Sequence, residues 1–475
     1  MLTHVVDTTA IDTYVAAQMR SLRIPGLALG IVRNNQVIYL CGYGVADPAG
    51  RPVTPQTPFI VGSITKSFTA LALMQLVERG KVELDDPVQR YLPWFRLADP
   101  DSSARLSLCH LLYHTSGISR YTGRELLAGQ GDASLEQQMR ELSGVRPLHP
   151  VGEVFQYSNA NYLVLGLVVQ IISGQPYGEY VREHILQSLQ MQHSFVSEAD
   201  ARQDGLATGY RWWFGLPYPA HVPYLPDVLP AGFLLTSAED MAHYLIAHLN
   251  GGRYGEASIL SPAGVAELHR PGAAIGSTGA CYGMGWVTES INGIAMLTHP
   301  GDTANFHADM ILLPESQWGI IVLTNANNAL IGQVEAAGRL GTWRIAAGIA
   351  GLLVGRQPSA GRLDARKFYA TFDVAITLLS TLQAWSLVEL LRDWRQPFPR
   401  QHLKRIRRVI PLIYEFLAPL TGLIGFPKWI GASWNVLRLY APDLAYWSLI
   451  MLPLTLAMGV LRAMLIFFHR SRETL

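Results

Sequence analysis

The chain has 475 residues, more than one ordinary domain needs, so two or three structural units are expected. Its net charge of +1 excludes a broad electrostatic attraction to nucleic acid, and no nucleic-acid partner is predicted. Hydrophobic residues make up 49% of the chain and charged residues 15%, which supports a large core and suggests membrane segments. The three cysteines are widely spaced without a CxxC pair, so neither a disulfide framework nor a zinc site is predicted.

The N-terminal region predicts one helix followed by two strands. Residues 1–26 lack a basic start followed by an apolar run, so we expect a short amphipathic helix and no signal peptide. The stretch GLALGIVRNNQVIYLCGYG (26–44) predicts two strands joined at Asn34-Asn35, a dipeptide that tolerates positive φ in a tight turn.

A serine and a lysine stand three positions apart at the start of the next apolar segment, FIVGSITKSFTALALMQLVERG (59–80). In a helix, Ser63 and Lys66 would share a face, with Cβ atoms about 5–6 Å apart. A serine hydroxyl needs a base to become a nucleophile, and lysine can serve only if burial lowers its pKa from about 10.4. The apolar neighbours can provide that burial, and the first-turn N–H groups favour a developing oxyanion. Taken alone, the pair is better explained by chance, because a serine and a lysine at this spacing are common.

Helical patterns dominate the middle of the chain, and strands return near residue 281. NANYLVLGLVVQIISG (159–174) and the segment after Ser237 predict apolar helices that end at glycine. Short strands joined by tight turns follow Cys281, and GTWRIAAGIAGLLVG (341–355) predicts a last helix too short to cross a bilayer. We therefore predict an α+β fold for residues 1–355, with one antiparallel β-sheet built from both ends of the domain, flanking helices and an inserted helical lobe.

Long apolar runs with tryptophan and tyrosine at their edges fill residues 356–475, which we predict to be a membrane region. The predicted transmembrane helices are residues 368–391, 409–426 and 444–468. The third is the strongest, because its only charge, Arg462, lies near enough to its end to snorkel to the surface. Asp373, Glu389 and Glu415 weaken the other two. A helical bundle packed in water is the alternative.

The loop between the first two predicted spans is strongly basic. RDWRQPFPRQHLKRIRR (392–408) carries seven arginines and lysines against one aspartate. A positive-inside bias at this loop predicts a multi-pass membrane protein whose N-terminal domain lies on the extracytoplasmic side. The expected lack of a signal peptide conflicts with that side, unless the first span drives export, the start is misplaced or the topology is inverted. A nucleic-acid patch is the weaker alternative, because the flanking apolar runs explain the charges.

Two further motifs join the serine–lysine pair, one just before a helix and one at the end of a strand. They lie in FQYSNANYLVLG (155–166) and LTHPGDTANF (297–306). The three motifs follow one another along the chain as Ser63-x-x-Lys66, Tyr157-x-Asn159 and His299-x-Gly301. In this order they resemble the penicillin-binding protein and serine β-lactamase superfamily. The chain is similar in particular to the class C β-lactamase-like serine hydrolases, which include D-aminopeptidases, carboxypeptidases and esterases. LLYHTSG (111–117) adds to a resemblance that covers roughly residues 11–355.

The resemblance implies a role for each matching residue. Ser63 would attack a carbonyl and become acylated, while Lys66 takes or holds its proton. Tyr157 would protonate the leaving group and then activate the deacylating water. The backbone N–H groups of Ser63 and Asp302 would form the oxyanion hole. The residues expected to bind substrate are Asn159, His299 and Gly301. No metal or other cofactor is implied, and His114 is expected to be structural, because a Ser–Lys–Tyr site needs no histidine base.

The third motif departs from the family pattern, because His299 stands where β-lactamases and carboxypeptidases usually have lysine. Histidine is largely neutral at pH 7, and we expect this one to become charged, and to favour anionic substrates, as the pH falls toward 6. Without a permanent cation, recognition of a substrate carboxylate weakens, and esters, amides or D-amino peptides are favoured.

The leading prediction is a membrane-tethered serine hydrolase that forms an acyl-enzyme with a small-molecule or peptide substrate. One alternative is a true β-lactamase or D-Ala-D-Ala carboxypeptidase. Another is a catalytically silent binding protein that senses peptidoglycan or a lipid. Nothing in the sequence indicates an oligomeric state.

Overall fold

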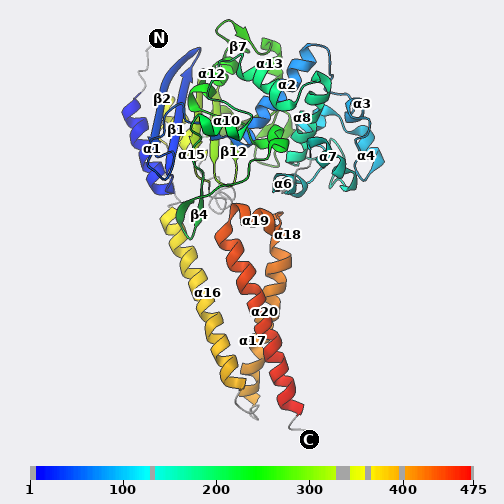
Figure 1. Cartoon of the computed structure of the whole chain (residues 1–475), viewed down its shortest axis with the longest axis vertical. Coiled ribbons are helices and arrows are strands. Elements are labelled where there is room, and N and C mark those ends of the chain that lie inside the picture. Colours follow the sequence, from blue (N-terminus) through cyan, green and yellow to red (C-terminus); the bar gives the residue numbers. More distant parts are fainter. Residues whose placement is uncertain are drawn as a thin grey trace. The chain divides into compact units, whose positions relative to one another are not determined.

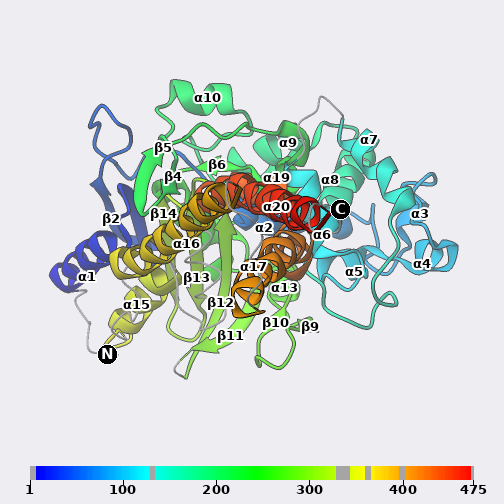
Figure 2. The ribbon, with the colours of Figure 1, turned by 90° about the horizontal axis from the view of Figure 1, so that it is seen from below.

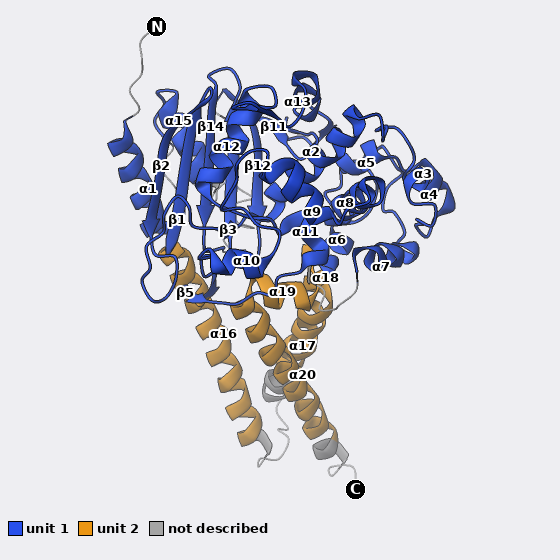
Figure 3. Ribbon diagram, turned by 45° about the horizontal axis from the view of Figure 1, so that its top comes forward, with its two compact units in different colours: residues 1–212, 216–364 blue, residues 213–215, 365–475 orange. Residues whose placement is uncertain are grey.

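The computed structural model describes residues 7–128, 134–291, 293–327, 343–358, 365–394 and 402–471. Figure 1 shows the chain coloured from its N-terminus to its C-terminus. The chain divides into two compact units, Met1–Trp212 with Leu216–Asp364, and Trp213–Gly215 with Ala365–Leu475 (Figure 3). We call them the first unit and the helical unit.

An eight-stranded sheet organises the first unit, with the strand order β2-β1-β14-β13-β12-β11-β10-β9. Its neighbouring strands are antiparallel, and β1 pairs with β14 from Leu27↔Thr324 to Arg33↔Trp318. The strands are β1 (Gly26–Arg33), β2 (Gln36–Gly44), β9 (Ala273–Ala274), β10 (Cys281–Tyr282), β11 (Val287–Ile291), β12 (Ile294–Asp302), β13 (His307–Leu313) and β14 (Trp318–Thr324). The pairing of the first strand with the last confirms the predicted sheet built from both ends of the domain.

Apolar residues cover both faces of this sheet. Every residue of β13 and β14 is buried, as expected for central strands that are covered on both sides. On one face, α1 (Thr8–Leu22) and α15 (Trp343–Leu353) contact each other and form a small apolar cluster with β1, β13 and β14 (Figure 2). The opposite face belongs to the main core.

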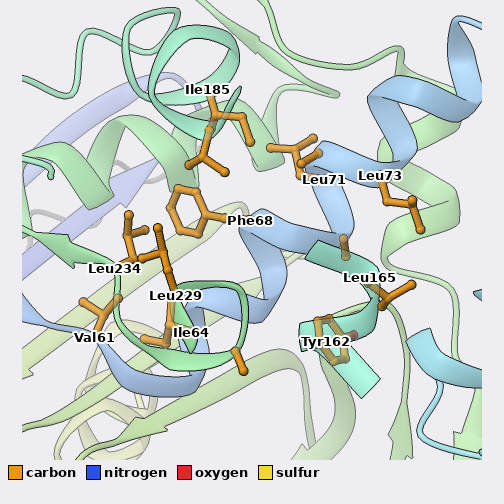
Figure 4. Close-up of a cluster of buried hydrophobic side chains, with 14 of the residues drawn as sticks. Val61, Ile64, Phe68, Leu71, Leu73, Tyr162, Leu165, Ile185, Leu229 and Leu234 are labelled. Atoms are coloured by element: carbon orange, nitrogen blue, oxygen red, sulfur yellow. The ribbon is translucent and has the colours of Figure 1, made fainter. Parts of the chain in front are cut away.

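Three helices carry most of that main core: α2 (Thr65–Glu78), α8 (Asn159–Ser173) and α12 (Ala238–Leu249). From Thr65 to Leu76 every residue of α2 is buried, which is typical of a helix enclosed on all sides. Figure 4 shows Phe68 of α2 among the apolar side chains of this core. The predicted helix ends are confirmed, because Gly174 caps α8 with a φ of 72° and the Ser237 side chain caps α12.

Shorter elements complete the first unit and build the inserted helical lobe. The short α-helices are α3 (Val88–Tyr91), α4 (Pro100–Arg105), α5 (Leu108–Leu112), α6 (Arg120–Ala128), α7 (Leu135–Arg140), α9 (Tyr177–Val181), α10 (Glu198–Gln203), α11 (Leu229–Gly232) and α13 (Pro262–Leu268). The single turns are η1 (Gly62–Ile64), η2 (Glu141–Gly144), η3 (Arg182–Leu186) and η4 (Pro226–Val228). The paired short strands are β3 (Phe59–Ile60) with β6 (Leu235–Thr236), β4 (Tyr210–Trp213) with β5 (Leu216–Pro219), and β7 (Arg253–Tyr254) with β8 (Ala257–Ser258).

The helical unit contains three helical segments that are long and apolar enough to cross a membrane. They are Ala365–Arg392, Val409–Ile430 and Pro442–Phe467. Its elements are α16 (Ala365–Trp394), α17 (His402–Leu420), η5 (Thr421–Gly425), α18 (Phe426–Ile430), α19 (Trp434–Tyr440) and α20 (Pro442–Ser471). Residues 395–401 of the predicted basic loop lie outside the described residues, so the predicted orientation in the membrane stays a prediction.

A buried ion pair joins the three long helices. Arg462 of α20 donates from Nε to both carboxylate oxygens of Glu415 in α17, at 3.0 and 3.1 Å. Its guanidinium also donates to the Ser386 hydroxyl of α16 at 2.8 Å. Arg462 is 4% exposed and Glu415 is 1% exposed. The expectation that Arg462 snorkels to the surface is therefore wrong. Its charge is neutralised inside the unit by Glu415, the residue that weakened the prediction of the second span.

Candidate active site

The structure brings Ser63 and Lys66 into contact. Ser63 lies in the 3₁₀ turn η1, directly before α2, and Lys66 is the second residue of α2. The Lys66 Nζ atom lies 3.0 Å from the Ser63 Oγ atom and 2.5 Å from the backbone oxygen of Ala231. The amine is therefore held against the hydroxyl from which it would take a proton.

Burial sets the charge of Lys66. The side chain is fully buried, and this loss of hydration lowers its pKa well below the usual 10.5. Among the described residues, no carboxylate forms an ion pair with it. Its other close neighbours are aromatic, with Nζ 5.1 Å from the Tyr157 ring centre and 5.8 Å from that of Tyr162. These surroundings favour the neutral amine, which is the form that can act as a base.

His114 positions the second motif. Its Nδ1 accepts the backbone N–H of Ser158 at 3.2 Å and the side-chain amide of Asn161 at 2.9 Å. Burial is the main reason that its pKa falls well below 6.5, which keeps the ring neutral and its Nδ1 an acceptor. The His114 and Tyr157 rings lie 4.3 Å apart. These contacts agree with the structural role predicted for His114. The ring holds the backbone next to Tyr157 and packs against the Tyr157 ring.

Asn159 is the first residue of α8, and it is 8% exposed. Its Nδ2 donates to the backbone oxygen of Gly123 at 3.4 Å. Its Oδ1 is buried and has no hydrogen-bond partner among the described residues. Asn159 is predicted to hold the amide or another polar group of a substrate, and a buried amide oxygen without a partner could accept a hydrogen bond from such a group.

The end of β12 presses against the turn that carries the serine. Gly62 has a φ of 53°, and a Cβ atom there would lie 2.5 Å from the backbone nitrogen of Asp302. A Cβ atom at Gly301 would lie 1.8 Å from the oxygen of Val61 and 3.1 Å from the nitrogen of Ser63. Only glycine fits at these two positions. The two N–H groups that are expected to form the oxyanion hole therefore lie in neighbouring segments of backbone.

His299 is 2% exposed, and both of its ring nitrogens have protein partners. Its Nδ1 lies 2.7 Å from the Pro300 oxygen, so it carries the proton, and its Nε2 then accepts the Tyr282 hydroxyl at 2.9 Å. Burial, with a smaller effect from nearby Lys66, lowers the pKa of His299 to about 3. The expectation that the ring becomes charged near pH 6 is therefore wrong. Direct contact of His299 with a substrate stays a prediction.

Sequence reasoning missed two partners in this site. Ala231 acts through its backbone oxygen, so its side chain left no signal. Tyr282 is an aromatic residue of β10 that binds His299 and lies against His114, with ring centres 4.6 Å apart. In the part of the chain that the structure describes, no three histidine, cysteine, aspartate or glutamate side chains are grouped as a metal ion would require.

The fold and the site together define the class of the protein. An antiparallel sheet, an inserted helical lobe and a serine beside a buried lysine are the features of the serine β-lactamase and penicillin-binding class. The sequence model of the Beta-lactamase family matches residues 11–338. The chain belongs to this family.

The chain is similar to two proteins in sequence and to one solved structure. Protein flp of Staphylococcus aureus (strain MW2) is 30% identical over 326 residues, which are 68% of this chain and 64% of that protein. The putative penicillin-binding protein PbpX of Bacillus subtilis (strain 168) is 28% identical over 334 residues, which are 70% of this chain and 78% of PbpX. The solved structure of the octameric penicillin-binding protein homologue from Pyrococcus abyssi matches with a TM-score of 0.63 and 28% identity, over 74% of this chain and 78% of that one. The chain thus spans less than two thirds of Protein flp.

Proposed function

We propose that this chain is a membrane-tethered serine hydrolase that cleaves ester, amide or D-amino peptide substrates through an acyl-enzyme on Ser63. The observation that carries the proposal is the 3.0 Å contact between the Ser63 hydroxyl and the buried, uncompensated amine of Lys66. A neutral amine at that distance can accept the hydroxyl proton as the oxygen attacks a carbonyl.

The remaining steps follow from the neighbouring groups. The N–H groups of Ser63 and Asp302 would stabilise the negative oxygen of the tetrahedral intermediate. Tyr157, whose ring lies 5.1 Å from the Lys66 amine, would pass a proton to the leaving group and later activate water. The amide of Asn159 would hold the polar part of the acyl group. The helical unit supports the membrane tether, because three of its helical segments are long enough to cross a bilayer.

The charges around the serine favour neutral acyl groups. His299 stands at the position of the third motif and stays neutral at ordinary pH, because burial lowers its pKa to about 3. A substrate carboxylate would therefore find no cation at this position. Esters, amides and D-amino peptides do not require one.

Turnover of β-lactams or cleavage of D-Ala-D-Ala is the second candidate function. It is favoured by the similarity to the putative penicillin-binding protein PbpX. The two candidates differ in the charge of the preferred acyl donor, so a substrate panel separates them.

The test uses the full chain in detergent with a fluorophosphonate probe. The wild type should be labelled, Ser63→Ala should not be, and Ser67→Ala, one turn along α2, should label like the wild type. Hydrolysis of p-nitrophenyl esters, D-amino acid anilides and nitrocefin would then rank the substrates. A folded wild type that is neither labelled nor active would overturn the proposal in favour of a silent binding protein.

A further inference from the structure

A second charged cluster lies at the hairpin between β12 and β13, apart from the groups that contact Ser63. Asp302 and His307 face each other across the hairpin as register partners. The His307 Nδ1 donates to the Asp302 Oδ1 at 2.8 Å. Its Nε2 lies 3.2 Å from the Asp309 Oδ2, within ion-pair distance but not aligned as a hydrogen bond. One imidazole ring therefore bridges two carboxylates.

The ring is buried and charged. The side chain of His307 is 1% exposed, that of Asp309 is 5% exposed, and that of Asp302 is 49% exposed. Burial opposes the charge on the ring, but Asp309 and Asp302 outweigh it and raise the pKa of His307 to about 10. Holding one cation between two carboxylates fixes the ring from both sides.

Asp302 connects the cluster to the predicted oxyanion hole. The carboxylate of Asp302 binds His307, while its backbone nitrogen lies against Gly62, beside the serine turn. A second tie comes from Asn327, whose Nδ2 donates to the Asp302 Oδ1 at 3.1 Å and to the Thr303 oxygen at 2.6 Å. Both ties restrain the residue that contributes an N–H group to the predicted oxyanion hole.

We propose that His307 is a positioning residue that, held between Asp302 and Asp309, aims the backbone N–H of Asp302 at the acyl oxygen on Ser63. The inference rests on the proposed function, because it assigns a task within the same reaction. Transition-state donors are effective only when their direction is fixed before the reaction. A tethered Asp302 carboxylate supplies that fixed direction, because its two partners restrain the residue whose N–H group is used.

The experiment measures steady-state hydrolysis of the best ester substrate by the full chain in detergent. His307→Leu removes both contacts and should lower kcat roughly 10- to 100-fold with little change in KM. This is less than the roughly 10²- to 10³-fold loss that follows removal of an oxyanion donor, because the Asp302 N–H group would be misdirected and not removed. His307→Asn should recover part of kcat, because its amide can still donate to Asp302. Ile311→Val, farther along the same face of β13, is the matched control for a small loss of packing and should keep the wild-type kcat.

Asn327→Ala provides a second test in case the His307 variants do not fold. It removes the hydrogen bond from Asn327 to Asp302, and Asn327 is only partly buried. It should lower kcat by a factor of about 3–10 and leave KM unchanged. If the wild type hydrolyses the ester and folded His307→Leu and Asn327→Ala keep its kcat, the inference is overturned while the proposed function stands. If the wild type neither reacts with the fluorophosphonate nor hydrolyses any ester, the proposed function fails, and this inference fails with it.

Discussion

Lys66 in α2 and Arg462 in α20 are both buried basic side chains, but among the residues that the structure describes only Arg462 has a carboxylate beside it. Lys66 lies against a hydroxyl, a backbone oxygen and two aromatic rings. Arg462 binds both oxygens of Glu415 and a serine hydroxyl. Burial without a counter-charge favours the neutral form of the Lys66 amine, which can act as a base. Burial against a carboxylate lets the Arg462 guanidinium form an ion pair that joins helices.

The largest effect on this comparison is expected from Lys66→Met, which keeps an unbranched side chain of nearly the same length and removes the amine. We expect kcat to fall by a factor of about 10²–10⁴, the usual contribution of a general base. Stability should not fall with it, because the wild type must desolvate a group that is charged in the unfolded chain. Activity assays and thermal unfolding at pH 7 measure both effects. Retained activity would show that Lys66 is not the base.

Arg462→Met should have the opposite effect on stability. Removing the guanidinium leaves the Glu415 carboxylate buried without a partner, at a cost of about 3–5 kcal/mol in the free energy of unfolding. The double variant Arg462→Met/Glu415→Leu should recover most of that loss, because the uncompensated charge goes as well. Unfolding of the full chain in detergent provides the measurement. A double variant that is as unstable as the single one would contradict the reading of this pair.

The pH dependence of stability sharpens the case of Lys66. Its pKa is lowered in the folded state, so the unfolded chain binds more protons and stability rises with pH. Between the lowered pKa and the unfolded value of about 10.5, the contribution of this group grows by about 1.4 kcal/mol per pH unit. The stability advantage of Lys66→Met over the wild type should therefore shrink between pH 7 and pH 9.5. Other titrations cancel in this difference, and a constant difference would mean that the folded lysine stays charged.

The smallest effect is expected at His299. With a pKa of about 3 the ring stays neutral between pH 8 and pH 6. The ratio of kcat/KM for nitrocefin to that for a neutral p-nitrophenyl ester should therefore stay constant, within a factor of about 2, over that range. A clear rise of the ratio toward pH 6 would show that the ring titrates and binds the carboxylate after all. His299→Lys should raise the ratio, by an amount equivalent to about 1–2 kcal/mol.

Local patterns in the sequence predict much of this molecule. Alternating and continuous apolar runs predicted the sheet, and Asn34, with a φ of 53°, takes up the expected turn. The spacing of Ser63 and Lys66 predicted a contact across one helical turn, which the structure places at 3.0 Å. These features depend on residues that are close together along the chain.

The misses depend on residues that are far apart along the chain. The pKa of His299 is lowered by burial and, to a smaller extent, by Lys66, which lies far away along the chain, so no local pattern records the shift. Arg462 pairs with Glu415, which lies 47 positions earlier. Each charge is unfavourable in its own predicted span, but the two charges neutralise each other once the helices pack. The contacts of His307 with Asp302 and Asp309 could not be predicted for a similar reason, because they depend on the register of the β12–β13 hairpin.

The pairing of β1 with β14 has a consequence for synthesis. The serine that opens α2 leaves the ribosome early, but the sheet behind it stays open until Thr324 is available to pair with Leu27. Bacterial and eukaryotic ribosomes add about 5–20 residues per second, so a delay of tens of seconds separates the first strand from its last neighbour. Throughout that interval β1 has an unpaired edge made of apolar residues, which is a template for wrong pairing. Among the described residues, the first helix that is long and apolar enough to cross a membrane begins at Ala365. About 40 residues of synthesis therefore separate the last strand partner of β1 from the start of that helix, so the sheet can close only shortly before the helix is made.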